Sequence, residues 1–144
     1  DHRHLHLSIR RQRQMCIRDS RIESLLDFTD KYFQDLSVEN LHDVRIALRR
    51  VRYSMELFIV CYDKKIFLKF YNKVQLLQDL SGNVRDVDIS LENINSLISQ
   101  NHIGIDDEMI KKANERKIVL EEKFNLELMK FSSGRVLKDF LKLL

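Results

Sequence analysis

Apolar residues recur at intervals of three and four along most of this chain, which is the spacing of one face of an α-helix. The first such stripe lies within residues 21–36 and consists of Ile22, Leu25, Leu26, Phe28, Tyr32, Phe33 and Leu36. A second stripe covers about Leu41 to Val60, and a third covers Ile66 to Leu80. Each of these segments is expected to form a helix with one buried side.

Polar and small residues mark the expected helix ends. Either Ser37 or Asn40 can cap the second helix. Gly82, in the run Ser81-Gly82-Asn83, fits the end of the third helix, because glycine readily takes the left-handed conformation found there. A fourth helix is then expected from about Val84 to Ile98.

The last third of the chain contains similar signals for helix ends. Residues 99–106 form the clearest loop, and Asp106 or Asp107 is expected to cap a long helix through about Phe131. Ser132-Ser133-Gly134 should interrupt it before a final helix from Val136 to Leu144. Five or six helices joined by short links predict an all-α fold, an antiparallel helical bundle.

Composition agrees with this interpretation. Proline is absent and glycine occurs three times, which favours long helices over turns. No apolar run approaches the roughly 20 residues that span a bilayer, so a membrane protein is not expected. Two cysteines, Cys16 and Cys61, do not make a disulfide framework, which favours the reducing cytoplasm.

The first 20 residues differ from the rest. They hold five arginines and two aspartates, whereas residues 21–144 hold 20 basic and 20 acidic side chains, so the body of the protein is neutral. Met15-Cys16-Ile17-Arg18-Asp19 resembles the translation of a sequencing-library adapter, and we interpret residues 1–20 as a non-native leader or a disordered tail, with native sequence as the alternative. The histidines in this segment lack partnering cysteines or carboxylates, so no metal site is expected.

The segment Leu41–Arg52 carries the candidate chemistry, with one histidine, four arginines and a single acid. At about 100° per residue, Arg45, Arg49 and Arg52 lie within about 80° of His42 in one stripe beside the apolar face. Arg50 projects about 80° to the other side of His42.

Such a row of like charges is unfavourable, because residues one turn apart repel each other. A polyanion would relieve the repulsion, since arginine binds phosphate oxygens through paired hydrogen bonds. The alternative is an ordinary charged face whose arginines pair with acids on neighbouring helices.

These residues resemble the signature of the CHAD family, the conserved-histidine α-helical domain. The family's H-x-x-R-x-x-x-R-R-x-R helix is matched here by His42, Arg45, Arg49, Arg50 and Arg52. A second family feature, L-x-x-x-x-R-D-x-D, is matched by Leu80, Arg85, Asp86 and Asp88. The resemblance covers about residues 21–144, with both motifs in the first half.

The resemblance implies a fold of antiparallel four-helix bundles that binds inorganic polyphosphate in a basic channel, as a non-catalytic accessory or targeting module without a cofactor. It also implies that the five residues of the first motif contact the ligand, with Lys73 and Arg85 as further contacts. Lys69 and Asp86 are secondary candidates. The alternative for Asp86 is a first-turn acid, or a partner that orients an arginine.

A full domain of this family has two bundles, each with its own basic helix, and residues 101–144 contain no second H-x-x-R helix. The resemblance therefore implies the N-terminal half of a domain. Its expected partners are a second half, missing from this chain or supplied by a homodimer, and a fused or neighbouring triphosphate tunnel enzyme. The expected location is the cytoplasm, including polyphosphate granules.

Three other functions compete with this one. An enzyme is disfavoured, because His42 and Asp43 face different directions on a helix and no nucleophile is paired with a base. A nucleic-acid-binding helical protein is disfavoured by the neutral body and the lack of an aromatic stacking platform. A purely structural helical interaction module is the third alternative.

Overall fold

The computed structural model describes residues 20–61, 64–100, 104 and 106–143. Residues 20–34 are helical, followed by α2 (Val38–Phe58), the 3-10 turn η1 (Ile59–Cys61), α3 (Lys64–Ser99), α4 (Asp107–Ser133) and α5 (Arg135–Leu143). This part of the chain contains no strand, so the all-α prediction is confirmed. Residues 1–19, nearly all of the interpreted leader, lie outside it.

For two helices the sequence offered two alternative N-caps each, and the structure shows which residue is the cap. Ser37 caps α2, and its hydroxyl accepts a hydrogen bond from the Asn40 backbone N–H at 3.2 Å. The Asn40 side chain instead donates to the Asp35 carbonyl oxygen at 2.9 Å. Asp106 caps α4 by accepting from the Glu108 backbone N–H at 3.1 Å.

The predicted helix end at Gly82 is wrong. α3 runs without interruption from Lys64 to Ser99 and has Gly82 in its interior. Val74, Leu77 and Val84 are all buried on one side of this helix, so the apolar stripe crosses the glycine in phase. Packing of such a stripe outweighs the modest loss of helix propensity at a single glycine.

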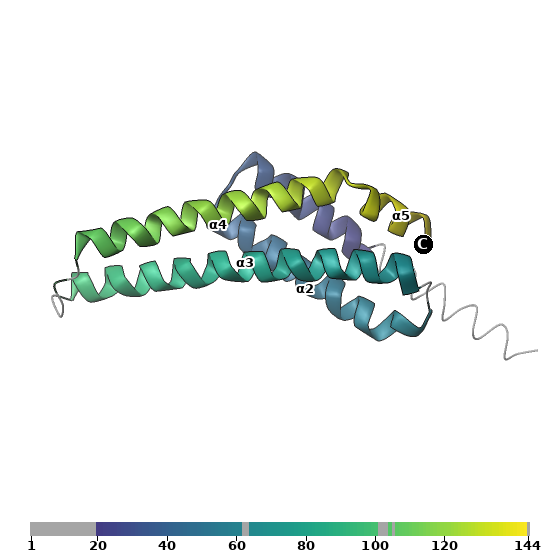
Figure 1. Cartoon of the computed structure of the whole chain (residues 1–144), viewed down its shortest axis with the longest axis horizontal. Helices are drawn as coiled ribbons and strands as arrows, with labels where there is room; N and C mark the ends of the chain where they lie inside the picture. Colours follow the sequence, from purple (N-terminus) through teal and green to yellow (C-terminus); the bar gives the residue numbers. More distant parts are fainter. Residues whose placement is uncertain (1–19, 62–63, 101–103, 105, 144) are drawn as a thin grey trace, which may run out of the picture.

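α3 and α4 lie side by side and antiparallel along the long axis of the molecule (Figure 1). α2 and α5 both pack against α3. A single core joins these elements; its largest fully buried side chains are Phe67, Phe70, Phe124, Phe140, Leu25, Leu48, Met55, Leu77 and Leu128. The stacked rings of Phe70 and Phe140, 4.0 Å apart, fix α5 against α3.

The core occupies only part of the length of the two long helices. None of the described side chains in residues 89–100 or 107–123 is buried, so the α3–α4 hairpin extends beyond the core as an arm. Leu36, predicted as part of the first apolar stripe, is 61% exposed because the helix has already ended at residue 34. No helix in the described ranges is long and apolar enough to cross a membrane.

Candidate functional site

α2 and α3 enclose a cleft of about 380 Å³ at the position of the predicted basic stripe. The α2 side supplies His42, Arg45, Ile46 and Arg49, and the α3 side supplies Gln78, Asp79, Gly82, Asn83 and Asp86. We call this space the His42 cleft. Three of the four predicted stripe residues therefore share one surface with residues of a second helix.

Arg45 and Arg49 are the two arginines of this cleft, and neither is neutralised by a direct contact. Within the described part of the chain, neither side chain makes an ion pair or a hydrogen bond. Arg45 is half-buried. Burial lowers the pKa of Arg45, as do the positive charges of Arg49 and Arg85, while Asp86 acts in the opposite direction. The positive charge of Arg45 is therefore partly desolvated and lies near the positive charges of Arg49 and Arg85.

Arg52 belongs to the same sequence stripe but is neutralised by its own helix. Its Nε lies 3.3 Å from Glu56 Oε1, one turn further along α2. The guanidinium also lies 5.3 Å from the centre of the Tyr53 ring. Tyr71 on α3 donates a hydrogen bond to the same Glu56 oxygen at 2.9 Å. Arg52 is therefore an arginine with local partners, outside the lining of the His42 cleft.

Arg50 faces the other flank of α2, as its position in the sequence predicts. It lines a separate cleft of about 420 Å³ with Ser20, Arg21, Ser24, Phe28 and Ala47. Arg21 donates a hydrogen bond to the Arg50 carbonyl oxygen at 3.1 Å. The five residues of the H-x-x-R-x-x-x-R-R-x-R motif are consequently divided among three environments.

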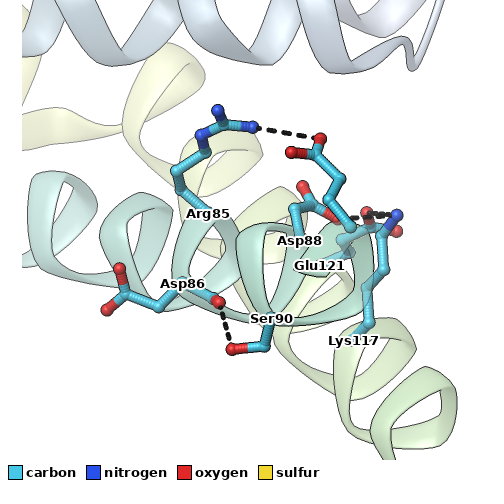
Figure 2. Close-up of polar contacts among 7 residues, drawn as sticks. Arg85, Asp86, Asp88, Ser90, Lys117 and Glu121 are labelled. Atoms are coloured by element: carbon cyan, nitrogen blue, oxygen red, sulfur yellow. Dashed lines mark hydrogen bonds and ion pairs between the residues drawn. The ribbon is translucent and has the colours of Figure 1, made fainter. Parts of the chain in front are cut away.

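The R-D-x-D motif is also divided, because its side chains leave α3 in different directions (Figure 2). Arg85 extends toward Glu92, with 3.7 Å between its Nη1 and Glu92 Oε1. Asp86 points away from Arg85 and lines the His42 cleft. Asp88 is buried and binds Lys117 of α4, with 2.7 Å between Asp88 Oδ1 and Lys117 Nζ.

Lys73 and Lys69 are not brought to the His42 cleft. Lys73 lies nine residues before Gly82, which is about 180° around the same helix. It lines a smaller cleft of about 190 Å³ near the break between α4 and α5, together with Lys130 and Arg135. Lys69 is exposed one turn earlier and does not line the His42 cleft.

The α3 wall of the cleft was mostly missed by the sequence analysis. Only Asp86 was predicted as a site residue on this wall. Gly82 and Asn83 were assigned to a helix end, and Gln78 and Asp79 were given no role. Asp79, Asn83 and Asp86 follow the spacing of one helix face, so the signal was present. It was hidden because the chain was divided into two helices at Gly82.

A second cleft adjoins the first across this wall. It has a volume of about 420 Å³, shares Asn83 and Asp86 with the His42 cleft, and reaches Arg116 on α4. No group of three or more histidine, cysteine, aspartate or glutamate side chains in the described ranges is arranged to hold a metal ion.

A family model described as the CHAD domain matches residues 3–95 of this chain. The matched region contains both motifs, all of α2 and most of α3, and ends before α4. No curated protein and no solved structure matches the chain.

Proposed function

Because this chain belongs to the CHAD domain family, we propose that it binds inorganic polyphosphate in the His42 cleft, as a binding module and not as an enzyme. The observation that carries the proposal is the state of Arg45 and Arg49. Both line the cleft, and neither has an ion-pair partner among the described residues. Their guanidinium donors are therefore free to bind an anion.

The spacing of these side chains suits a linear anion. Arg45 and Arg49 are one helical turn apart, and consecutive turns are separated by about 5.4 Å. A chain of phosphates running along α2 would meet one guanidinium per turn, and each guanidinium can hold two phosphate oxygens. His42, one turn before Arg45, would add a donor; His42 and Arg49, at the two ends of the row, are both exposed, and Arg45 between them is half-buried.

The aspartates on the opposite wall oppose the binding of any anion. Asp79 and Asp86 face the same space as the two arginines, so contacts with several basic side chains of α2 are needed to outweigh their repulsion. A ligand that carries a negative charge on every unit makes several contacts with the α2 wall at once. This arrangement supports polyphosphate over a single phosphate ion.

Equilibrium titration with polyphosphate of defined length tests the proposal. Arg49→Gln should weaken binding about tenfold, because a charge-assisted contact contributes about 1.5–3 kcal/mol and glutamine retains part of the polar contact. His42→Ala should weaken binding less. Arg135→Gln on α5 is the matched control, since it removes the same charge away from the His42 cleft, and it should leave affinity unchanged.

Two binding results would contradict the proposal. One is an absence of binding by the unmodified protein at low salt. The other is an equal loss of affinity in Arg49→Gln and Arg135→Gln, because that would indicate attraction to overall charge. Release of orthophosphate from the bound polymer would contradict the non-catalytic part of the proposal.

A nucleic-acid-binding protein is the rival candidate, and salt dependence does not separate the two, because both ligands are polyanions. Competition does. An oligonucleotide at equal phosphate concentration should not displace long-chain polyphosphate.

The proposal extends to the expected partners, a second CHAD half and a triphosphate tunnel enzyme, and to cytoplasmic or granule location.

A further inference from the structure

Gly82 occupies an unusual position for a glycine, in the interior of a long helix. α3 extends for more than four turns on either side of it. Glycine is a poor residue for this position, because it loses more backbone freedom on helix formation than any other residue. A specific reason for glycine here would be a need for space.

The protein itself does not need that space. A Cβ atom added at Gly82 would meet no other atom within 4 Å. Gly134, between α4 and α5, is the opposite case, because a Cβ there would come within 2.5 Å of the Lys130 carbonyl oxygen. Close packing within the fold therefore explains the glycine at 134 but not the one at 82.

The open space at Gly82 belongs to the His42 cleft. Gly82 lies on the wall that faces His42, Arg45 and Arg49. Asp79 and Asp86 lie about one turn before and after it on the same wall. Between these two carboxylates, Gly82 is a place where α3 presents neither a charge nor a side chain to an anion held by the arginines.

We infer that Gly82 is where the bound polyanion lies against the backbone of α3, and that the missing side chain limits which ligands fit between α2 and α3. The inference rests on the proposed function and adds a specificity-determining residue to it. Glycine commonly serves where a ligand must approach the main chain closely. The loss of helix stability at Gly82 is then the consequence of keeping the cleft open.

Replacing Gly82 separates stability from binding. Gly82→Ala should raise the midpoint of thermal unfolding by about 2–4 °C, because alanine is the better helix former and meets no clash. The same substitution should weaken polyphosphate binding. Gly82→Leu fills more of the cleft and should weaken binding on the order of tenfold, the effect of crowding a packed contact.

Asn95→Ala is the matched control on the same helix. Asn95 is exposed in the arm, more than three turns from Gly82, and it also exchanges a poor helix former for alanine. It should increase stability without any change in polyphosphate affinity. This control distinguishes occlusion of the cleft from a general effect of a more stable α3.

Each outcome has a distinct meaning. Two results together support the inference. Polyphosphate affinity should be highest in the unmodified protein, lower in Gly82→Ala and lowest in Gly82→Leu. The unfolding midpoint of Gly82→Ala should be at or above that of the unmodified protein. Unchanged affinity in Gly82→Leu would overturn it while leaving the proposed function intact, as would a lower unfolding midpoint in Gly82→Ala. A failure of the unmodified protein to bind polyphosphate would overturn the proposed function and the inference with it.

Discussion

At the scale of single residues, three arginines of one helix show how local partners decide what a side chain is free to do. Arg45 and Arg49 face a cleft without an ion-pair partner in the described part of the chain, whereas Arg52 is held by Glu56. An ion pair one turn apart on a helix is worth only a few tenths of a kcal/mol, so Arg52 remains able to exchange partners. Arg45 and Arg49 do not have to give up an ion pair before they bind an anion.

Tyr32 allows a prediction about alkaline pH. It donates a hydrogen bond to Asn125 of α4 at 2.6 Å, and burial, assisted by the negative charge of Glu121, raises its pKa from 10.0 to about 12. The folded state therefore keeps this proton over a range in which the unfolded chain loses it. The stability that Tyr32 contributes is fully present below pH 10 and is lost as the pH rises to about 12.

Denaturant unfolding of the unmodified protein and Tyr32→Phe between pH 8 and pH 12 tests this expectation. At pH 8 the phenylalanine variant should be less stable by about 1 kcal/mol, the usual value of one hydrogen bond. The difference should shrink above pH 10. A difference that stays constant up to pH 12 would show that the Tyr32 pKa is not raised on folding.

At the scale of helices, α3 organises the molecule because its different sides serve different purposes. One side is buried in the core, a second forms the wall of the His42 cleft, and Lys73 points away from that cleft. The sequence predicted most of the helices correctly, because apolar periodicity identifies a helix face directly. It did not predict the relative directions of Lys73 and Asp86, since an assumed break at Gly82 removes the fixed rotation that relates them.

Pairing between helices was harder to predict than the helices themselves. The four-residue spacing of Arg52 and Glu56 is visible in the sequence, whereas the contact of Asp88 with Lys117 joins two different helices. Such a contact depends on how far and at what angle α4 lies from α3. Periodicity along one chain contains no information on either quantity.

The buried contact between α3 and α4 should contribute more to stability than the exposed ones. Lys117→Met leaves the 6% exposed carboxylate of Asp88 without its partner, and Asp88 Oδ2 already lacks a hydrogen bond. We expect a loss of about 2–3 kcal/mol in the free energy of unfolding. Lys112→Met removes a lysine whose partner Glu108 is exposed, and it should cost at most about 0.5 kcal/mol.

Unfolding of both variants in urea at neutral pH provides the comparison. Adding Asp88→Asn to Lys117→Met should recover part of the loss, because the buried charge is then absent. Equal effects of Lys117→Met and Lys112→Met would mean that the ion pair of Asp88 and Lys117 does not fix α4 to α3.

At the scale of the whole molecule, charge is arranged locally. Residues 21–144 are neutral overall, yet the His42 cleft has a basic wall on α2 and an acidic wall on α3. Binding of a polyanion is therefore expected to depend on position in this cleft more than on net charge. The acidic wall was not foreseen from the sequence, because it becomes visible only when α2 and α3 are placed side by side.

Mapping of backbone amide chemical shifts during titration with polyphosphate of defined length tests this account most directly. A ligand in the His42 cleft should produce its largest shifts in residues 42–49 of α2 and 78–86 of α3, with little change in α5. The basic residues Lys73, Lys130 and Arg135 serve as an internal comparison, because they line a different cleft of the same protein. The assignment of the His42 cleft as the polyphosphate site would be contradicted if the largest shifts occurred at the cleft lined by Lys73, Lys130 and Arg135. Equal shifts over all exposed lysines and arginines would also contradict it.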